Sequence, residues 1–206
     1  MELHSVPEAK PELISARALR ALRVESIDLY QFHSGSDRQL LNEGLWAMLA
    51  EQKRAGKIRH LGISILGKGS EPQAKEAKRL GVEALQVIYS RLDRRPEELY
   101  FPHARWQNLG ILARVPLASG LLSGKYRPGA AFPANDWRST FEAERMGKDL
   151  AEVERIRQTE VPAGMAMAQW ALAWCLKNPA VSAVIPGCKD PAQVASNAAA
   201  AELADG

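Results

Sequence analysis

A group of small and charged residues in the middle of the chain has the composition of an anion-binding loop. It follows an apolar, β-prone run that begins at Ile111 and predicts a buried strand, which Pro116 would end because proline lacks a backbone donor. The group consists of Ser119, Gly120, Ser123, Gly124 and Lys125. Small side chains let backbone N–H groups approach an anion, and the Lys125 ammonium adds positive charge. The stretch is consistent with a diphosphate cradle, and an ordinary surface loop is the alternative.

The composition indicates a globular protein with one sizeable core. The chain has 206 residues, of which 46% are hydrophobic and 25% are charged, and its formal net charge is +3. That charge is too small to indicate a nucleic-acid partner. No apolar run in the sequence reaches the length that spans a membrane, and the N-terminus has no signal-peptide core. We therefore expect a cytoplasmic protein with neither nucleic acid nor membrane as a partner.

The cysteines and histidines give no indication of a metal site. Cys175 and Cys188 lack the spacing of metal ligands, and we expect free thiols in a reducing cytoplasm. The four histidines are scattered along the sequence, so a zinc site built from neighbouring residues is not expected.

Strand and helix patterns alternate along the chain. Strands are predicted with centres near residues 30, 61, 86, 113 and 183. Helices are predicted over residues 11–23, 41–56, 72–80, 97–109, 149–158 and 162–176 and after Asp190, with a Pro- and Gly-rich loop over 127–147. The alternation predicts an α/β fold with a parallel sheet. Periodicity alone allows an open doubly wound sheet or part of a (β/α)8 barrel. The first strand–helix turn lacks Gly-x-Gly-x-x-Gly, and this absence disfavours the doubly wound dinucleotide-binding sheet.

Five segments together resemble the aldo-keto reductase family. They are IDLYQFH at 27–33, GKIRHLGIS at 56–64, LQVIYS at 85–90, VPLASGLLSGKY at 115–126 and VSAVIPGCKDPAQVASN at 181–197. The resemblance covers about residues 11–203 and implies a (β/α)8 TIM barrel. A barrel needs roughly 250 residues, and this chain provides about five of eight strands with flanking helices. We therefore expect a single domain over residues 1–206 that is an incomplete, N-terminally truncated barrel.

The resemblance implies hydride transfer between NADPH and a carbonyl or alcohol, with an Asp, a Tyr, a Lys and a His as the catalytic residues. Only the His is matched here, by His33, which would orient the carbonyl. In the family the other three come from strands and loops before this one. Tyr30 falls on the opposite strand face from His33, and the other tyrosines do not match the catalytic position. Whether this chain alone is an enzyme is therefore left open, and without the resemblance His33 would be an ordinary strand-end histidine.

The resemblance assigns the cofactor residues more fully. Ser64 and Gln86 would hold the nicotinamide carboxamide, although Gln86 could also be a core polar group. Arg114 stands where many members stack an aromatic ring, and a planar guanidinium can stack as well. The pyrophosphate would be surrounded by Pro116, Leu117, Ser119, Gly120, Leu122 and Lys125. The adenosine end would be met by Gly187, Lys189, Gln193 and Asn197.

The same positions leave the cofactor choice open. Many members have a Lys where Gly187 stands and an Arg where Gln193 stands, so preference for a 2′-phosphate is in doubt unless Lys189 compensates. We expect NADP, with NAD as the other possibility.

Two functions follow from these patterns. The first is an aldo-keto reductase-type oxidoreductase that acts on a small carbonyl substrate in the full barrel. The alternative is a catalytically silent nucleotide-binding or interaction protein. An incomplete barrel would leave the strands near residues 27 and 181 without one neighbour each. We therefore also expect self-association, or binding of the missing N-terminal half, through those open edges.

Overall fold

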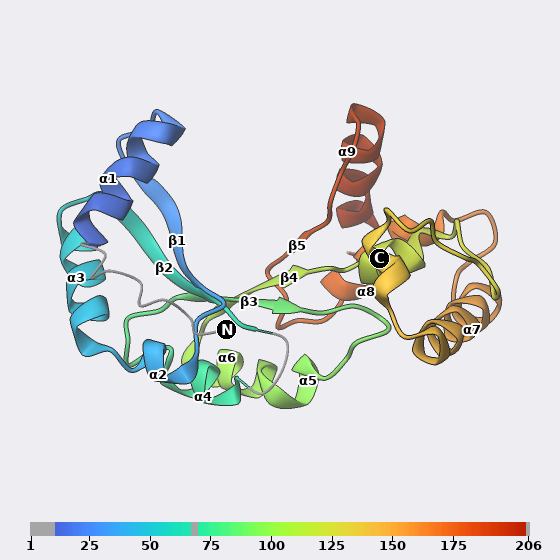
Figure 1. The fold of residues 1–206 in the computed structure, drawn as a ribbon, viewed down its shortest axis with the longest axis horizontal. Coiled ribbons are helices and arrows are strands. Elements are labelled where there is room, and N and C mark those ends of the chain that lie inside the picture. The colour runs from blue at the N-terminus through green and yellow to red at the C-terminus, as the bar shows by residue number, and fades with distance from the viewer. Residues whose placement is uncertain (1–10, 67–69, 205–206) are drawn as a thin grey trace. The chain divides into compact units, whose positions relative to one another are not determined.

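The computed structural model describes residues 11–66 and 70–204, and it divides into two compact units (Figure 1). The first unit comprises residues up to 86 together with 103–109, and the second comprises 87–102 and 110–206.

The five predicted strands are all present and belong to one α/β sheet. They are β1 (Ile27–His33), β2 (Ile58–Ser64), β3 (Ala84–Ile88), β4 (Gly110–Arg114) and β5 (Ala183–Ile185), in the order β1-β2-β3-β4-β5. The β1–β2, β2–β3 and β4–β5 pairs run parallel. Parallel neighbours need crossover connections, which the intervening helices provide.

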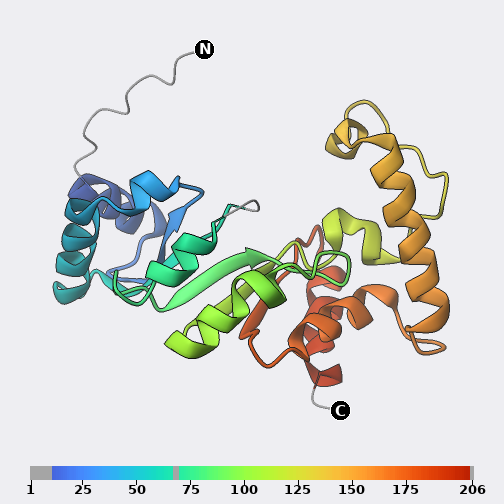
Figure 2. The same cartoon turned by 90° about the horizontal axis from the view of Figure 1, so that it is seen from below.

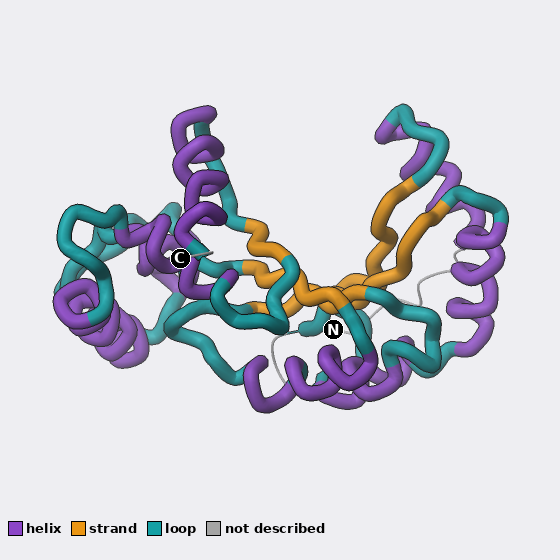
Figure 3. Tube along the Cα trace, turned by 180° about the vertical axis from the view of Figure 1, so that it is seen from behind, coloured by secondary structure: helices purple, strands orange, loops and turns teal. Residues whose placement is uncertain are grey.

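The first unit covers one face of its strands with helices. These are α1 (Pro11–Leu22), α2 (Asp37–Leu40), α3 (Glu43–Arg54), α4 (Glu71–Glu76) and most of α6 (Phe101–Gln107). Helix α3 packs on β2, and α1 packs on α3 (Figures 1 and 3). Leu61, Ile63 and Leu85 lie on the apolar face of β2 and β3 and are fully buried. Because side chains alternate along a strand, the intervening residues of these strands face the other side.

The second unit is mostly helical. It contains α5 (Pro96–Leu99), η1 (Ala118–Ser123), η2 (Trp137–Thr140), α7 (Ala143–Thr159), α8 (Met167–Leu176), α9 (Pro191–Ala198) and η3 (Ala199–Leu203), where η marks a 3-10 helix. The long α7 and the apolar α8 both contact η1 (Figure 2). Across residues 11–66 and 70–204, no helix is both long and apolar enough to cross a membrane.

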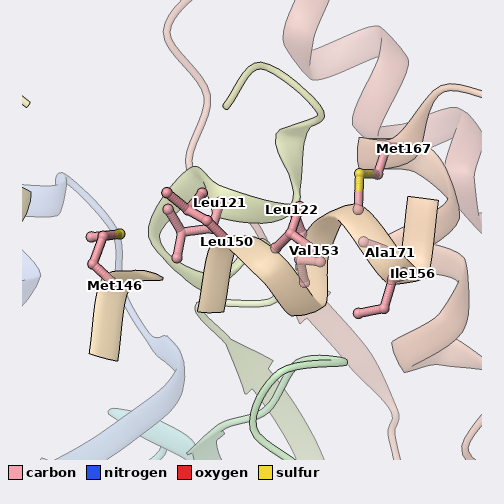
Figure 4. Close-up of a cluster of buried hydrophobic side chains, with 8 residues drawn as sticks. All are labelled: Leu121, Leu122, Met146, Leu150, Val153, Ile156, Met167 and Ala171. Atoms are coloured by element: carbon pink, nitrogen blue, oxygen red, sulfur yellow. The ribbon is translucent and has the colours of Figure 1, made fainter. Parts of the chain in front are cut away.

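An apolar cluster supports η1 from below (Figure 4). Leu121 and Leu122 of η1 meet Leu150 and Val153, which lie on one face of α7. Met146, Ile156, Met167 and Ala171 complete the cluster. The 3-10 turn is therefore held by buried side chains of two longer helices.

Several predicted boundaries need correction. The predicted helix 72–80 ends at Glu76. The predicted helix 97–109 is interrupted at Tyr100 and continues as α6, beside Pro102, which has no N–H to donate. The predicted loop 127–147 contains η2 and the start of α7. The predicted helix 162–176 begins only at Met167, because Pro162 and Gly164, at φ +80°, form a turn before it.

Candidate functional site

Three predicted site residues of the first unit lie in one row across the sheet. His33 is the register partner of Ser64, and Ser64 is the register partner of Gln86. Partners in a parallel register point their side chains to the same face. The structure therefore brings together the strand-end histidine and the two residues predicted for the carboxamide, on the face opposite the helices.

The three residues differ in their surroundings. His33 is exposed at the end of β1. Ser64 is only 1% exposed, and its Oγ has no hydrogen-bond partner among the described residues. Gln86 is half-buried, and its Oε1 accepts a hydrogen bond of 3.0 Å from Gln31 Nε2. A buried hydroxyl without a partner is uncommon in a folded protein.

Sequence reasoning missed Gln31. The residue precedes His33 by two positions, so alternation places both on the same face of β1. Its register partner is Gly62, where an added Cβ would lie 3.0 Å from Gln31 Cγ and 3.2 Å from the Ala84 carbonyl oxygen. The alternating pattern of β1 could have shown that Gln31 shares a face with His33. The sequence could not show that Gly62 lies beside Gln31.

The second unit contains a cavity of about 730 Å³ between η1, the segment around η2 and the start of α9. Eight of the residues predicted for the cofactor line it: Pro116, Leu117, Ser119, Gly120, Lys125, Gly187, Lys189 and Gln193. The sequence segments 115–126 and 186–193 thus meet in space. This volume is in the range of small-molecule sites, roughly 300–1,000 Å³.

The backbone of η1 has the shape of an anion-binding nest. Ser119 and Gly120 break the 3-10 helix with φ values of 60° and 88°, and Ala118 before them has φ 47°. Non-glycine residues rarely adopt positive φ, and when they do the surrounding structure must hold them. Successive N–H groups in such turns can bind an anion, and here the Ala118 and Gly120 N–H groups also donate to the Val115 and Leu117 carbonyls, both at 2.9 Å. An added Cβ at Gly120 would lie 3.3 Å from Arg138 Nη1, so the space beside this turn is narrow.

Arg138 fixes the nest, and it too was missed. Its Nη1 donates to the Ser119 carbonyl at 3.3 Å, while its Nε and Nη2 donate to Asp136 at 2.9 and 2.5 Å. The guanidinium also stacks over the rings of Tyr126 and Phe132, at 4.8 and 4.5 Å from their centroids. Hydrogen bonds from the side chain and backbone of Arg138 lower the pKa of Asp136 to about 2. Residues of the predicted loop 127–147 therefore contact η1 and hold its backbone in place.

The start of α9 combines a cation with a carboxylate. Asp190 caps the helix, accepting from the Gln193 N–H at 2.8 Å and from Gln193 Nε2 at 3.0 Å. The Lys189 N–H donates to Gln193 Oε1 at 3.1 Å. Lys189 lines the cavity beside these groups, so this end offers a positive charge and several hydroxyl-binding groups.

Three of the predicted residues that belong to the second unit do not line its cavity. Leu122 is 0% exposed within the apolar cluster. Asn197 donates through Nδ2 to Cys188 Sγ at 3.2 Å. Arg114 ends β4 as the register partner of Ile185, where burial lowers its pKa.

Comparison with known proteins identifies the family. Residues 13–205 match the aldo/keto reductase family. The chain belongs to this family. It is 31% identical over 178 residues to the aldo-keto reductase yakc [NADP(+)] of Schizosaccharomyces pombe, covering 84% of this chain and 52% of that protein. It is 29% identical over 204 residues to the NADH-specific methylglyoxal reductase of Escherichia coli, covering 96% of this chain and 60% of that protein.

The solved structures of the family show the same fold. The glycerol dehydrogenase AKR11B4 from Gluconobacter oxydans superposes with a TM-score of 0.79 at 29% identity, over 91% of this chain and 57% of that one. Such neighbours are TIM barrels, so the five-stranded sheet corresponds to part of a barrel. The chain spans less than two thirds of the length of each of these three relatives.

Proposed function

We propose that the chain binds a nicotinamide dinucleotide and forms the cofactor side of an aldo-keto reductase-type oxidoreductase. The observation that carries the proposal is the cavity of the second unit, where the η1 nest, Lys125 and Lys189 surround one space. A diphosphate carries two negative charges, and backbone N–H groups with a nearby ammonium are a common way to hold it.

The residues present fit such a ligand. The cavity walls carry the side chains of Lys125, Lys189 and Arg138 against the single carboxylate of Asp136. Gly120 has φ +88°, and an added Cβ would lie 3.3 Å from Arg138 Nη1, so a glycine suits this position beside the proposed anion.

The chemistry proposed for the complete site is interconversion of a small carbonyl compound and its alcohol. The nicotinamide ring, when bound, supplies or accepts the hydride. His33 has an exposed imidazole at the end of β1, and its ring N–H would donate to the carbonyl oxygen of the substrate and orient it. Ser64 and Gln86, in the same row, would hold the carboxamide and so fix which ring face meets the substrate.

For the cofactor we propose NADPH, with NADH as the alternative. Lys189 at the start of α9 is the group that would meet the 2′-phosphate. Asp190 next to it favours a ribose hydroxyl, because a carboxylate accepts from hydroxyls and repels phosphate. Lys189 therefore favours NADPH and Asp190 favours NADH, and substituting each residue alone separates the two effects.

Titration of tryptophan fluorescence tests both proposals, because Trp137 is 60% exposed and lines the cavity. Lys125→Ala should weaken binding of both dinucleotides by about 10-fold, whereas Lys189→Ala should weaken NADPH more than NADH. Asp190→Asn keeps a capping side chain and should favour NADPH. Lys148→Ala, on the exposed side of α7, is the control. Unchanged affinity in Lys125→Ala would show that the nest is not the diphosphate site.

We expect the 206-residue chain alone to show no appreciable turnover with NADPH and nitrobenzaldehyde. General acid catalysis contributes about 100- to 10,000-fold, and none of the tyrosines matches the acid position of the family. Tyr30 cannot substitute, because it lies on the other face of β1 from His33 and burial raises its pKa. Turnover of about 1 per second or more that His33→Ala abolishes would refute this expectation.

A further inference from the structure

We infer that Gln73 is a positioning residue for His33, because its side-chain amide holds the turn that directly follows β1. The inference rests on the role proposed for His33. The family resemblance assigns no role to Gln73, and the residue does not line the cavity of the second unit.

The turn after β1 has a strained backbone. Ser34, the residue next to His33, has φ 51°, which is rare for a residue with a side chain. Its N–H donates to the Ser64 carbonyl at 3.1 Å, so the pairing of β1 with β2 continues into the turn. Strained residues persist only where their surroundings hold them, and they cluster at functional sites. The contacts that hold Ser34 therefore also hold the end of β1 at His33.

Gln73 of α4 supplies two of these contacts. Its Nε2 donates to the Gly35 carbonyl at 2.9 Å and to Asp37 Oδ1 at 2.8 Å. Gln73 is only 1% exposed, so water competes little for these hydrogen bonds. Helices α2 and α4 contact each other (Figure 1). One amide thus ties the turn and the first residue of α2 to α4.

The turn also packs on an aromatic pair. An added Cβ at Gly35 would lie 1.9 Å from Phe32 Cζ, so the Phe32 ring lies directly against this glycine. The ring centroids of Phe32 and Trp46 are 5.9 Å apart. Packing of this kind limits how closely Gly35 can approach, whereas hydrogen bonds also fix direction. Loss of the Gln73 amide should therefore let Ser34 relax while the first unit stays folded.

The position of the strand end matters because His33 has to reach a carbonyl oxygen. An N–H group donates well only over about 2.7–3.2 Å, and a displacement of about 1 Å can lower a rate by about 100-fold. His33 is exposed at the end of β1, where strands fray most readily. Gln73 acts on the imidazole through the backbone of residues 34–37, which it keeps in one conformation.

The experiment observes His33 directly in the 206-residue chain. The chain has four histidines, so ¹³C labelling at Cε1 gives a simple NMR spectrum, in which His33→Gln assigns the His33 signal. Gln73→Met removes the amide and keeps the length of the side chain. We expect it to shift or split the His33 signal and to leave that of His60, which lies in β2 and binds Glu83, unchanged. Hydrogen exchange of the Ser34 N–H should become about 10-fold faster, because a buried hydrogen bond to a charged group is lost.

Two substitutions of Asp37 separate positioning from general stability. Asp37→Asn keeps an acceptor oxygen for Gln73 and should leave the His33 signal as in the parent chain. Asp37→Ala removes that acceptor and should shift the His33 signal in the same direction as Gln73→Met. Circular dichroism shows which variants are folded. If Gln73→Met is not, the two Asp37 variants decide the question.

Gln107→Met is the matched control. It removes a buried glutamine of α6 that binds the Ala74 carbonyl and the Lys78 N–H of the α4 region, and it should leave the His33 signal unchanged. An unchanged His33 signal in folded Gln73→Met would overturn the inference, as would equal effects of Asp37→Asn and Asp37→Ala. The proposed function is tested separately by the dinucleotide titration of the second unit, so the two can fail independently.

Discussion

Gly62 determines what the neighbouring side chains of the first unit can do. We expect Gly62→Ala to lower the free energy of unfolding by about 1–3 kcal/mol, as overpacking usually does. The reason is that the new Cβ would lie 3.2 Å from the Ala84 carbonyl oxygen, which is backbone and cannot turn away. Urea denaturation followed by circular dichroism measures the change.

Gly147→Ala is the matched control for this substitution. Gly147 lies within α7, and an added Cβ there meets nothing within 4 Å among the described residues. Alanine is the better helix former, so the control should gain about 0.5–1 kcal/mol. If Gly62→Ala were equally neutral or stabilising, the space over β2 would be larger than the structure shows.

Asp136 makes a pH-dependent contribution to the folding stability of the second unit. Its pKa is about 2 when folded, against about 3.9 for an unfolded aspartate. A lowered pKa means that the contribution is complete above about pH 4 and is lost as the pH falls toward 2. The melting temperature of the parent chain should exceed that of Asp136→Asn at pH 6, and the gap should narrow at pH 3. A constant gap would mean that Asp136 is not ionised beside Arg138.

Among single residues, the sequence predicted those proposed to touch the cofactor better than those that hold other residues in place. His33 and Ser64 end predicted strands and Gln86 lies within one, and parallel pairing places the three residues in one row. Gln31 was missed because its role depends on a glycine of the neighbouring strand, and pairing register is not visible in one sequence. Arg138 was missed because its stretch has the composition of a loop, and Ser119, the η1 residue that it contacts, is 19 residues away in the chain.

Among the helices and strands, η1 is held in its backbone conformation by a side chain outside it, that of Arg138. We expect Arg138→Lys to weaken NADPH binding by about 10-fold, because lysine cannot bind Asp136 with two parallel hydrogen bonds and still reach the Ser119 carbonyl. The same fluorescence titration measures the change. Positive φ at Ala118 and Ser119 should then relax, which faster backbone hydrogen exchange in η1 would report.

Arg155→Lys is a suitable comparison for Arg138→Lys. Arg155 lies on the exposed side of α7 and also binds carboxylates, those of Glu152 and Glu160. It does not line the cavity, so binding should be unchanged. Equal affinities in the two variants would show that Arg138 does not position the nest.

The elements themselves followed the sequence patterns unevenly. All five strands were confirmed, since buried β-prone runs between turn residues are a strong pattern. Helix ends were less accurate. The stretch 143–148 has few apolar residues, yet it is helical, and its Met146 is buried in the apolar cluster of the second unit. Tertiary packing of that kind overrides local composition.

For the whole molecule, the outer strands of the sheet are the expected sites of self-association. Within the described residues, β1 pairs only with β2 and β5 only with β4. Unpaired strand edges bind other edges readily, and a charge on the edge prevents it. We expect the chain to be oligomeric in light scattering, and Leu29→Lys on β1 to shift it toward monomer. Leu41→Lys, outside the strands, should not. A monomeric parent chain would contradict this.

The sequence predicted the class of the molecule and its family, because five separate segments had to agree in order and spacing. The family was confirmed by the match over residues 13–205. The division into two compact units was not predicted. Strand and helix patterns are local, whereas such a division depends on contacts that are distant in the chain.

The close packing around Gly62 also constrains the order in which residues of this protein can change during evolution. A side chain at position 62 conflicts with Gln31, Leu29 and the Ala84 backbone, so we expect changes around this position to precede a change at residue 62. Once Gln31 is lost, Gln86 has no partner from β1, and selection on both positions is relaxed. Substitutions at 31, 62 and 86 should therefore occur together among descendants, with the change at 62 rarely the earliest.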